Sequence, residues 1–341
     1  MPGGALESKS KPPGPARVAL MVSYLSDEYE WQIWRGARAA VEARGGTLLC
    51  AAGGTLNDPV RERRARNFVL DLVGSGKVDG ILAISSVIGQ YLGPDAAGEF
   101  LRRHAIPACS IGAATGVPSV TVDQADGVAQ LIHHLVTQHA HHRVAFVTGN
   151  RGNPEAELRL TAYVRALERL GVPYDPKLVF EGDFTRESGV QAACTLLDRR
   201  QIPVSELDAI VAANDYTAFG VMDELARRRI AVPEQVAVVG FDDMALASEY
   251  VPPLTTVRQP IEALGREAGR IVCDRIARRA DSSGVALQTE VVLRRSCGCV
   301  PTDMPPPSRS LSESPTPLVV DELGTQLLAA VLDEAEALLG A

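Results

Sequence analysis

Short apolar strand patterns alternate with longer helical patterns along most of this 341-residue chain. The strand-like segments 17–22, 47–51 and 80–84 are separated by two helical stretches, and the alternation starts again at Val144. Strands that alternate with helices are joined by crossovers, so they pair in parallel with helices on both faces of the sheet. The sequence therefore predicts an α/β fold with two doubly wound parallel-sheet lobes.

The all-apolar run Val236–Val239 predicts a strand that is buried on both faces of its sheet. Gly240 ends this strand, and Asp242 follows at what would be its carboxyl end. Because open α/β sheets bind ligands beyond the carboxyl ends of their strands, we expect the binding site here. The strand-like segment 254–257, placed before the helix that follows Pro260, indicates a crossover between two bodies of structure.

Length and composition restrict the class of protein. A chain of 341 residues exceeds one typical hydrophobic core, which favours two lobes. No apolar run is long enough to span a membrane, and the N-terminus lacks the apolar core of a signal peptide, so we predict a cytoplasmic protein without a membrane partner. The net charge of −8 includes −6 from residues 301–341. No segment has a basic nucleic-acid footprint, so no direct nucleic-acid binding is expected.

Cysteines and histidines give no predicted metal site. Cys50, Cys109, Cys194 and Cys273 occur singly in apolar or helical patterns, as buried free thiols do. The Cys297-Gly298-Cys299 segment could bind zinc only with two further ligands, which the nearby sequence does not offer. The histidines between residues 133 and 142 straddle a predicted helix end. Neither a nucleophile elbow nor a dinucleotide-binding turn occurs, so we predict no metal, no cofactor and no enzyme activity.

Seven stretches resemble, in the same order, the effector-binding domain of the LacI-type repressors, whose fold is shared with periplasmic ribose-binding proteins. The stretches are VDGILAISS, VPSVTVDQADG, HRVAFVTGN, LVFEGDFTRESG, AIVAANDYTAFGVMDEL, VPEQVAVVGFDD and PPLTTVRQPIEALGREA, within about residues 17–295. The resemblance implies two lobes joined by three hinge crossovers, near residues 122–123, 254–258 and 293–296. It also implies a small ligand held in the cleft and a homodimer formed through the first lobe.

This resemblance and the composition together divide the chain into five parts. They are a disordered tail (1–16), a first lobe (17–122 and 258–281), a second lobe (123–257 and 282–299), a Pro/Ser linker (300–317) and an acidic amphipathic helix (318–341). The apolar stripe of that helix could pack on a partner helix or further module, or on the protein's own surface.

Two departures from the family's repressors bear on the output of the chain. Those repressors carry a DNA-reading helix-turn-helix of about sixty residues before the first strand, whereas sixteen residues precede it here, so operator binding in the family's way is not expected. The ending Arg294–Cys299 looks like the variant of this domain that is fused to signalling output modules.

Several second-lobe side chains match ligand contacts of the family. Arg159 matches the arginine of an Arg-x-x-Gly-aromatic segment, and its planar guanidinium suits vicinal hydroxyls or a carboxylate. Asn214 would face the ligand while Asp215 caps the next helix, and Asp242 would accept from a ligand hydroxyl. Asp123, at the first crossover, could do the same. The alternatives are a solvated arginine and turn-capping aspartates.

The first lobe would complete the site. Asp27 and Tyr29 align with a family segment that carries two aromatic residues, and Glu30 replaces the second of them. Such an acid favours a hydroxylated or cationic ligand over an anionic one. Tyr29, Trp31 and Phe184 are candidate apolar walls. The predicted ligand-binding residues are Asp27, Tyr29, Ser85, Ser86, Asp123, Arg159, Phe184, Asn214 and Asp242.

Donors and acceptors that converge in this way are typical of polyol recognition, because each hydroxyl needs both a donor and an acceptor. The functional hypothesis is a cytoplasmic sensor of a sugar or nucleoside-like molecule, within a transcription-regulator or signal-transduction protein. It would close on its ligand and pass the lobe rotation to a partner or output module. The alternatives are a transport-type solute-binding protein and a ligand-free interaction scaffold.

Overall fold

A computed structural model describes residues 15–74, 76–279 and 284–299 of the chain. The described residues all lie within one compact unit, residues 1–301. The predicted linker and acidic helix, and most of the predicted N-terminal tail, lie outside the described residues.

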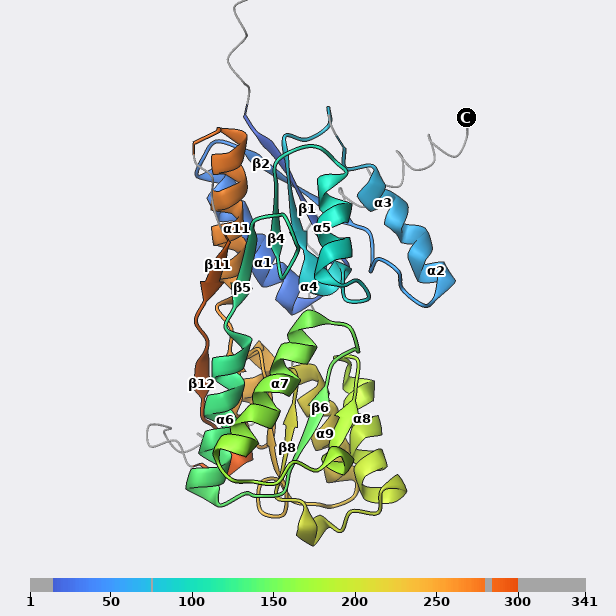
Figure 1. Cartoon of the computed structure of the whole chain (residues 1–341), viewed down its shortest axis with the longest axis vertical. Coiled ribbons are helices and arrows are strands. Elements are labelled where there is room, and N and C mark those ends of the chain that lie inside the picture. The colour runs from blue at the N-terminus through green and yellow to red at the C-terminus, as the bar shows by residue number, and fades with distance from the viewer. Residues whose placement is uncertain (1–14, 75, 280–283, 300–341) are drawn as a thin grey trace, which may run out of the picture. The chain divides into compact units, whose positions relative to one another are not determined.

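The first lobe is built on a six-stranded sheet in the order β11-β5-β4-β3-β1-β2, in which every pairing is parallel. Along β1, Val18, Leu20 and Val22 enter one core while Ala19 and Met21 enter the other, so this strand is buried on both faces. Helices α1 and α11 cover the first face, and α3 and α5 cover the second (Figure 1). The elements are β1 (Arg17–Val22), α1 (Glu28–Glu42), β2 (Thr47–Ala52), α2 (Arg61–Arg64), α3 (Phe68–Asp71), β3 (Gly80–Ile84), α4 (Ser85–Ile88), α5 (Pro94–Arg102), β4 (Ala108–Ile111), β5 (Ser119–Val122), α11 (Ile261–Ile276) and β11 (Val285–Leu287).

The second lobe repeats this arrangement on a four-stranded parallel sheet in the order β7-β6-β8-β9. Helices α6 and α7 pack on one face, and α8 and α9 pack on the other (Figure 1). The elements are α6 (Gln124–His139), β6 (Val144–Thr148), α7 (Pro154–Arg169), β7 (Val179–Glu181), α8 (Arg186–Cys194), β8 (Ala209–Ala212), α9 (Asp215–Arg227), β9 (Ala237–Val239) and α10 (Ala245–Glu249). The predicted α/β fold class is confirmed.

The chain passes between the lobes at three places. The first is Asp123, between β5 and α6, and the second follows β10 (Thr256–Arg258) and leads into α11. The third lies between β11 and β12 (Glu290–Val292), and β12 pairs with β10 in antiparallel fashion. Residues 282–299 were all expected in the second lobe with a crossover near residues 293–296, but Val285 pairs with Val120 in the first sheet. A three-residue edge strand carries too short a pattern to reveal this pairing.

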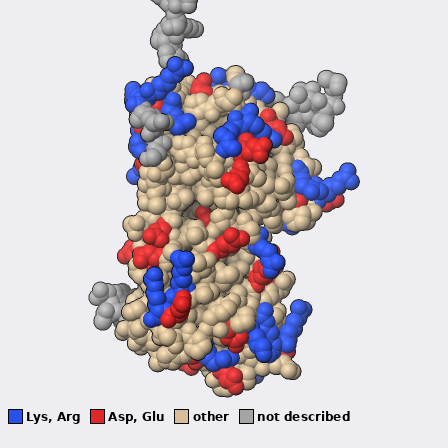
Figure 2. All heavy atoms as spheres, in the orientation of Figure 1, with Lys and Arg blue, Asp and Glu red and all other residues tan. Residues whose placement is uncertain are grey.

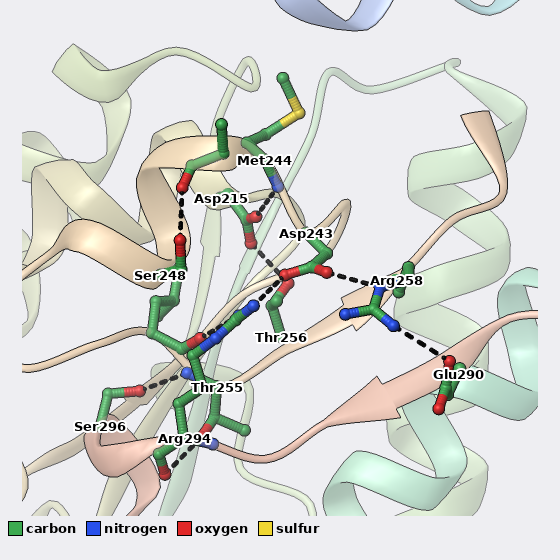
Figure 3. A network of polar contacts seen from close by, with 12 residues as sticks. Asp215, Asp243, Met244, Ser248, Thr255, Thr256, Arg258, Glu290, Arg294 and Ser296 are labelled. Atoms are coloured by element: carbon green, nitrogen blue, oxygen red, sulfur yellow. Dashed lines mark hydrogen bonds and ion pairs between the residues drawn. The ribbon is translucent and has the colours of Figure 1, made fainter. Parts of the chain in front are cut away.

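A polar network joins the second and third crossovers to the end of β9 (Figure 3). Asp243 accepts from Arg258 Nε at 2.6 Å and from Arg294 Nη2 at 2.7 Å. Arg294 Nη1 also donates to the Leu254 carbonyl at 2.8 Å, and the Ser296 hydroxyl donates to the Val238 carbonyl at 2.5 Å. These contacts fix the hinge segments directly beside Asp242.

Candidate functional site

A cavity of about 190 Å3 lies where the two lobes meet, beyond the carboxyl ends of their strands. Both lobes contribute to its walls. Seven of the nine predicted ligand-binding residues line it, namely Asp27, Tyr29, Ser86, Arg159, Phe184, Asn214 and Asp242.

Arg159 lies on α7 with only 2% of its surface exposed, so it is not a solvated helix arginine. Its Nε donates to Gln124 Oε1 at 2.7 Å, and its Nη1 donates to the Ala213 carbonyl. Its guanidinium carbon lies 3.9 Å from the centre of the Phe241 ring. Within the described residues, three of the five N–H groups of Arg159 have a partner when the 3.4 Å contact to Glu155 is included, which leaves donors for a ligand.

Asp242 follows β9 and is held in the left-handed region, with φ of 127°. A non-glycine residue rarely adopts this conformation, and such residues are concentrated at functional sites. Gln259 Nε2 donates to Asp242 Oδ1 at 2.5 Å. Among the described residues, no hydrogen bond reaches the buried Gln259 Oε1. Burial raises the pKa of Asp242 well above its usual value, against the opposing charge of Arg159. The pair thus offers acceptor oxygens to a ligand.

Asn214 lines the cavity as predicted, but it also caps the helix, which was the role predicted for Asp215. Asn214 is the cap of α9, since its Oδ1 accepts from the Thr217 amide at 3.0 Å, and it lines the cavity as well. Asp215 does not cap the helix, because it is fully buried and accepts from the Met244 amide at 2.8 Å and from Thr256 Oγ1 at 2.6 Å. The helix begins one residue earlier than the sequence suggested, so the cap falls on Asn214.

The first lobe presents Asp27, Tyr29 and Glu30 to the cavity from the start of α1. Asp27 Oδ1 caps the helix by accepting from the Tyr29 amide at 2.9 Å. Glu30 turns back to the end of β1, where it accepts from the Ser23 amide at 2.7 Å and from the Ser23 hydroxyl. Burial raises the pKa of Glu30 to about 7. The acid that replaces the family's aromatic residue is therefore a buried, internally hydrogen-bonded group.

Two of the nine predicted ligand-binding residues and one candidate wall residue lie outside the cavity lining. Ser85 is not among the lining residues, and it accepts a hydrogen bond from Ser110 Oγ at 2.8 Å. Asp123 caps α6, accepting from the Ala125 and Asp126 amides at 3.1 and 3.0 Å, which is the alternative that the sequence left open. Trp31 is 45% exposed and stacks on Trp34 rather than forming a cavity wall.

Several lining residues were not predicted from the sequence. Glu155 precedes Arg159 by one helical turn, so a pairing at i and i+4 could have indicated it. Gln259 and Tyr216 carried no motif of their own. The remaining unpredicted lining residues are Ser23, Tyr24, Val87, Gln90 and Asn153. With Asp27, Glu30, Glu155 and Asp242 against one arginine, the lining is acidic, which disfavours an anionic ligand.

Comparison with known proteins identifies the family. A model of the periplasmic binding protein-like domain matches residues 132–297. The HTH-type transcriptional regulator CelR of Thermobifida fusca is 32% identical over 290 residues, which cover 82% of this chain and 80% of CelR. A sugar-binding transcriptional regulator of the LacI family from Escherichia coli superposes with a TM-score of 0.66 at 27% identity, covering 83% of this chain and 99% of that one. The chain belongs to the LacI family.

Other members support this assignment. The HTH-type transcriptional repressor CytR of Escherichia coli (strain K12) is 29% identical over 287 residues, covering 83% of this chain and 80% of CytR. A solved complex of the transcriptional regulator CelR with cellobiose has a TM-score of 0.70 at 31% identity and covers 82% of this chain and 84% of that one. These relatives of the LacI-family chain are transcriptional regulators, which confirms the prediction that it is not an enzyme.

The expectation that this LacI-family chain does not bind nucleic acid finds no support among these relatives, since CelR and CytR are named HTH-type regulators. On the face drawn in Figure 2, basic and acidic side chains are interspersed. Within the described residues, no helix combines the length and apolar character that crossing a bilayer requires.

Proposed function

We propose that this domain senses a neutral, hydroxylated small molecule of the sugar or nucleoside class, and that it does so in the cytoplasm as part of a transcription-regulator or signal-transduction protein. The cavity at the junction of the lobes carries this proposal, because both lobes supply polar side chains to one acidic, aromatic-walled space. The cellobiose complex of CelR supports the sugar class by analogy.

The lining suits hydroxyl groups better than charged groups. Arg159 offers spare N–H donors, while Asp242, Glu155 and Gln259 Oε1 offer acceptors. Tyr29, Tyr216 and Phe184 provide ring faces, on which the apolar side of a sugar or base packs. A hydroxyl uses a donor and an acceptor together, so this combination matches a polyol or a nucleoside ribose.

Ligand binding would act through the arrangement of the lobes. Hydrogen bonds join them at the cleft: the Ala245 amide donates to Glu28 Oε1 at 3.0 Å, and Asn153 Nδ2 donates to the Ser86 carbonyl at 3.5 Å. A ligand that contacts both walls favours the closed arrangement by its difference in affinity for the closed and open forms. The hinge network around Asp243 would pass this change to a partner or output module.

A thermal-shift screen against neutral sugars, sugar acids, nucleosides and purines tests the proposal. A ligand present at about 100 times its Kd should add roughly 2.7 kcal/mol to the free energy of unfolding. Asp242→Asn keeps the side-chain shape and should weaken the binding of a hit by roughly tenfold to a hundredfold, because the amide NH2 cannot accept from a ligand hydroxyl and leaves that buried hydroxyl unsatisfied.

The matched control is Arg151→Ala, which removes an arginine that is not among the lining residues and is exposed at 84% of its side chain. It should leave the affinity unchanged. A hit that binds Asp242→Asn as tightly as the unaltered chain would place the ligand elsewhere. A screen without hits, repeated by calorimetry, would contradict the sensor and favour an interaction scaffold.

A further inference from the structure

Two histidines and two cysteines that are far apart in the sequence meet in the second lobe. His134 and His139 lie in the last turns of α6, while Cys297 and Cys299 follow β12. Figure 1 shows β12 running alongside α6. The two imidazole nitrogens and two sulfurs that these side chains present all lie within 4.8 Å of one another. Cys297 and Cys299 could bind zinc only with two further ligands, which the neighbouring sequence lacks and which α6 supplies.

Four of the six separations between these atoms match the edges of a metal tetrahedron, and the other two are within 4.8 Å. A zinc ion bound at about 2.0–2.1 Å to nitrogen and about 2.3 Å to sulfur with tetrahedral angles gives edges of about 3.3 Å for N···N and about 3.6 Å for N···S. The two Nε2 atoms lie 3.2 Å apart. The N···S separations are 3.7 Å for His134 to Cys297, 3.4 Å for His134 to Cys299 and 3.5 Å for His139 to Cys299.

Ordinary hydrogen bonding does not account for the cluster. His134 Nε2 is within 3.7 Å of three other potential ligand atoms, His139 Nε2 and the two sulfurs. A ring nitrogen carries either one N–H or one lone pair, so it makes one directional hydrogen bond and not three. A cation at the centre of the four atoms satisfies all of them at once.

The backbone around the cysteines is also shaped for this approach. Gly298 has φ of 103°, a conformation that L side chains rarely adopt, and a Cβ there would lie 3.2 Å from two atoms of the His139 ring. Cys297 is 1% exposed, and its sulfur accepts from Thr255 Oγ1 at 3.1 Å. A hydroxyl that donates to a coordinating sulfur is the kind of outer contact that orients metal ligands.

We propose that His134, His139, Cys297 and Cys299 bind one Zn2+ ion in a closed, structural site. Tetrahedral coordination by two nitrogens and two thiolates selects zinc among the common divalent ions, and four protein ligands leave no open position for catalysis. The spacing of the histidines falls within the usual range, whereas the Cys-x-Cys spacing is one residue shorter than usual. Binding releases the two thiol protons as the thiolates form.

A zinc ion at this site would cross-link two segments of the second lobe. It ties the C-terminal turn of α6 to the segment that leaves the third crossover, next to the Ser296 and Arg294 contacts of the hinge network (Figure 3). Zinc would thereby fix the position of Cys299, the last residue that the structure describes.

The test is the metal content and stability of the purified full chain. Protein that is prepared under reducing conditions with zinc and then desalted should contain one zinc ion per chain, as measured by inductively coupled plasma mass spectrometry. A strong zinc chelator should remove it and lower the Tm, and added zinc should restore the Tm. Cobalt exchanged into the site should show the intense visible bands of tetrahedral coordination together with thiolate charge transfer.

Matched variants separate the site from other thiols and imidazoles. Cys299→Ser and His139→Ala should lose the bound zinc, while Cys50→Ser and His133→Ala, which alter exposed residues, should keep it. The chelation experiment uses the unaltered chain, so it tests the zinc site even if Cys299→Ser fails to fold. Metal-free protein with intact thiols after zinc treatment would overturn the proposal, as would a Cys297–Cys299 disulfide in the reduced preparation or unchanged zinc in both ligand variants.

Discussion

Four carboxyl groups that line the cavity have pKa values above their ordinary values. Burial raises the pKa of Asp27, Glu30, Glu155 and Asp242. An acid with a raised pKa holds its proton more tightly in the folded chain than in the unfolded chain. The free energy of unfolding therefore falls as pH rises from the unfolded pKa through the folded pKa. In the absence of ligand, these four groups are thus expected to lower the free energy of unfolding least on the acidic side of neutrality.

Glu30→Gln tests this behaviour at one residue. The pKa of Glu30 rises from 4.5 to about 7, so the unaltered chain should lose stability across that interval while the variant does not. From pH 5 to pH 8, the free energy of unfolding of the variant relative to the unaltered chain should increase by about 1–3 kcal/mol. Urea denaturation at both pH values measures this. The exposed Glu42→Gln serves as the control, and a pH-independent difference for Glu30→Gln would refute the assignment.

Predictability from sequence differed between residues for physical reasons. Arg159 and Asp242 lie in motifs that place them at fixed points of a helix and a strand end, and both reach the cavity. Ser85 and Ser86 follow the same strand, but neighbouring residues point in different directions, and only the second lines the cavity. Asn214 and Asp215 differ by one position in a helix start, which sequence patterns do not resolve.

At the level of elements, the pairing of α1 with α11 depends on glycines within both helices. A Cβ on Gly265 would lie 2.0 Å from the Ile33 carbonyl oxygen, and one on Gly36 would lie 1.9 Å from the Glu262 carbonyl oxygen. An alanine ordinarily favours a helix over glycine by up to about 1 kcal/mol. Here the added methyl would force apart two backbones that are in contact, so the packing cost should exceed that gain.

Gly265→Ala is accordingly expected to lower the free energy of unfolding by about 1–3 kcal/mol, the range for overpacking a close contact. Chemical denaturation monitored by circular dichroism gives the value. Gly93→Ala is the matched control, because nothing lies within 4 Å of a Cβ at Gly93. Equal effects of the two substitutions would show that the helices can separate freely.

The hinge network depends on Asp243, which is 9% exposed at its side chain and pairs with both Arg258 and Arg294. Asp243→Ala leaves Arg294, which is 16% exposed, without that partner. We expect a loss of about 2–4 kcal/mol in unfolding free energy, since removing one member of a buried pair leaves a charge uncompensated. The exposed pair of Arg151 and Glu181 is the control, and Glu181→Ala should cost less than about 1 kcal/mol. Denaturant titration of both variants compares them directly, and similar losses would show that Asp243 is not an anchor.

Element order was predictable because strand and helix periodicities are local properties of the sequence. β1, β6 and β8 are apolar runs that any parallel sheet would bury. Contacts between distant segments were not predictable in this way. The pairing of β11 with β5 and the meeting of Cys299 with His134 join residues that are more than 160 positions apart. Such contacts depend on where the crossovers lead the chain, and a local sequence pattern does not reveal this path.

For the whole molecule, the homodimer implied by family resemblance would form through the first lobe. That lobe exposes Phe68 at 62% and Leu72 at 53%, and α3 packs beside β2, an edge strand on which Leu49 is 45% exposed. Apolar side chains beside an unpaired strand edge are features that a partner surface would cover. In such a dimer, a ligand that changes the arrangement of the lobes in one chain would also affect the partner chain.

Phe68→Asp and Leu72→Asp should convert that dimer into a monomer, because each places a charge in the apolar contact and its desolvation opposes association. Analytical ultracentrifugation of the unaltered chain and the variants over a range of concentrations measures the change. Leu158→Asp is the matched control, since Leu158 is 52% exposed but lies on α7 in the second lobe, and it should leave the dimer intact. A dimer that persists in both first-lobe variants and dissociates in Leu158→Asp would show that the interface lies on the second lobe. The lobe rotation would then reach the partner chain through different helices.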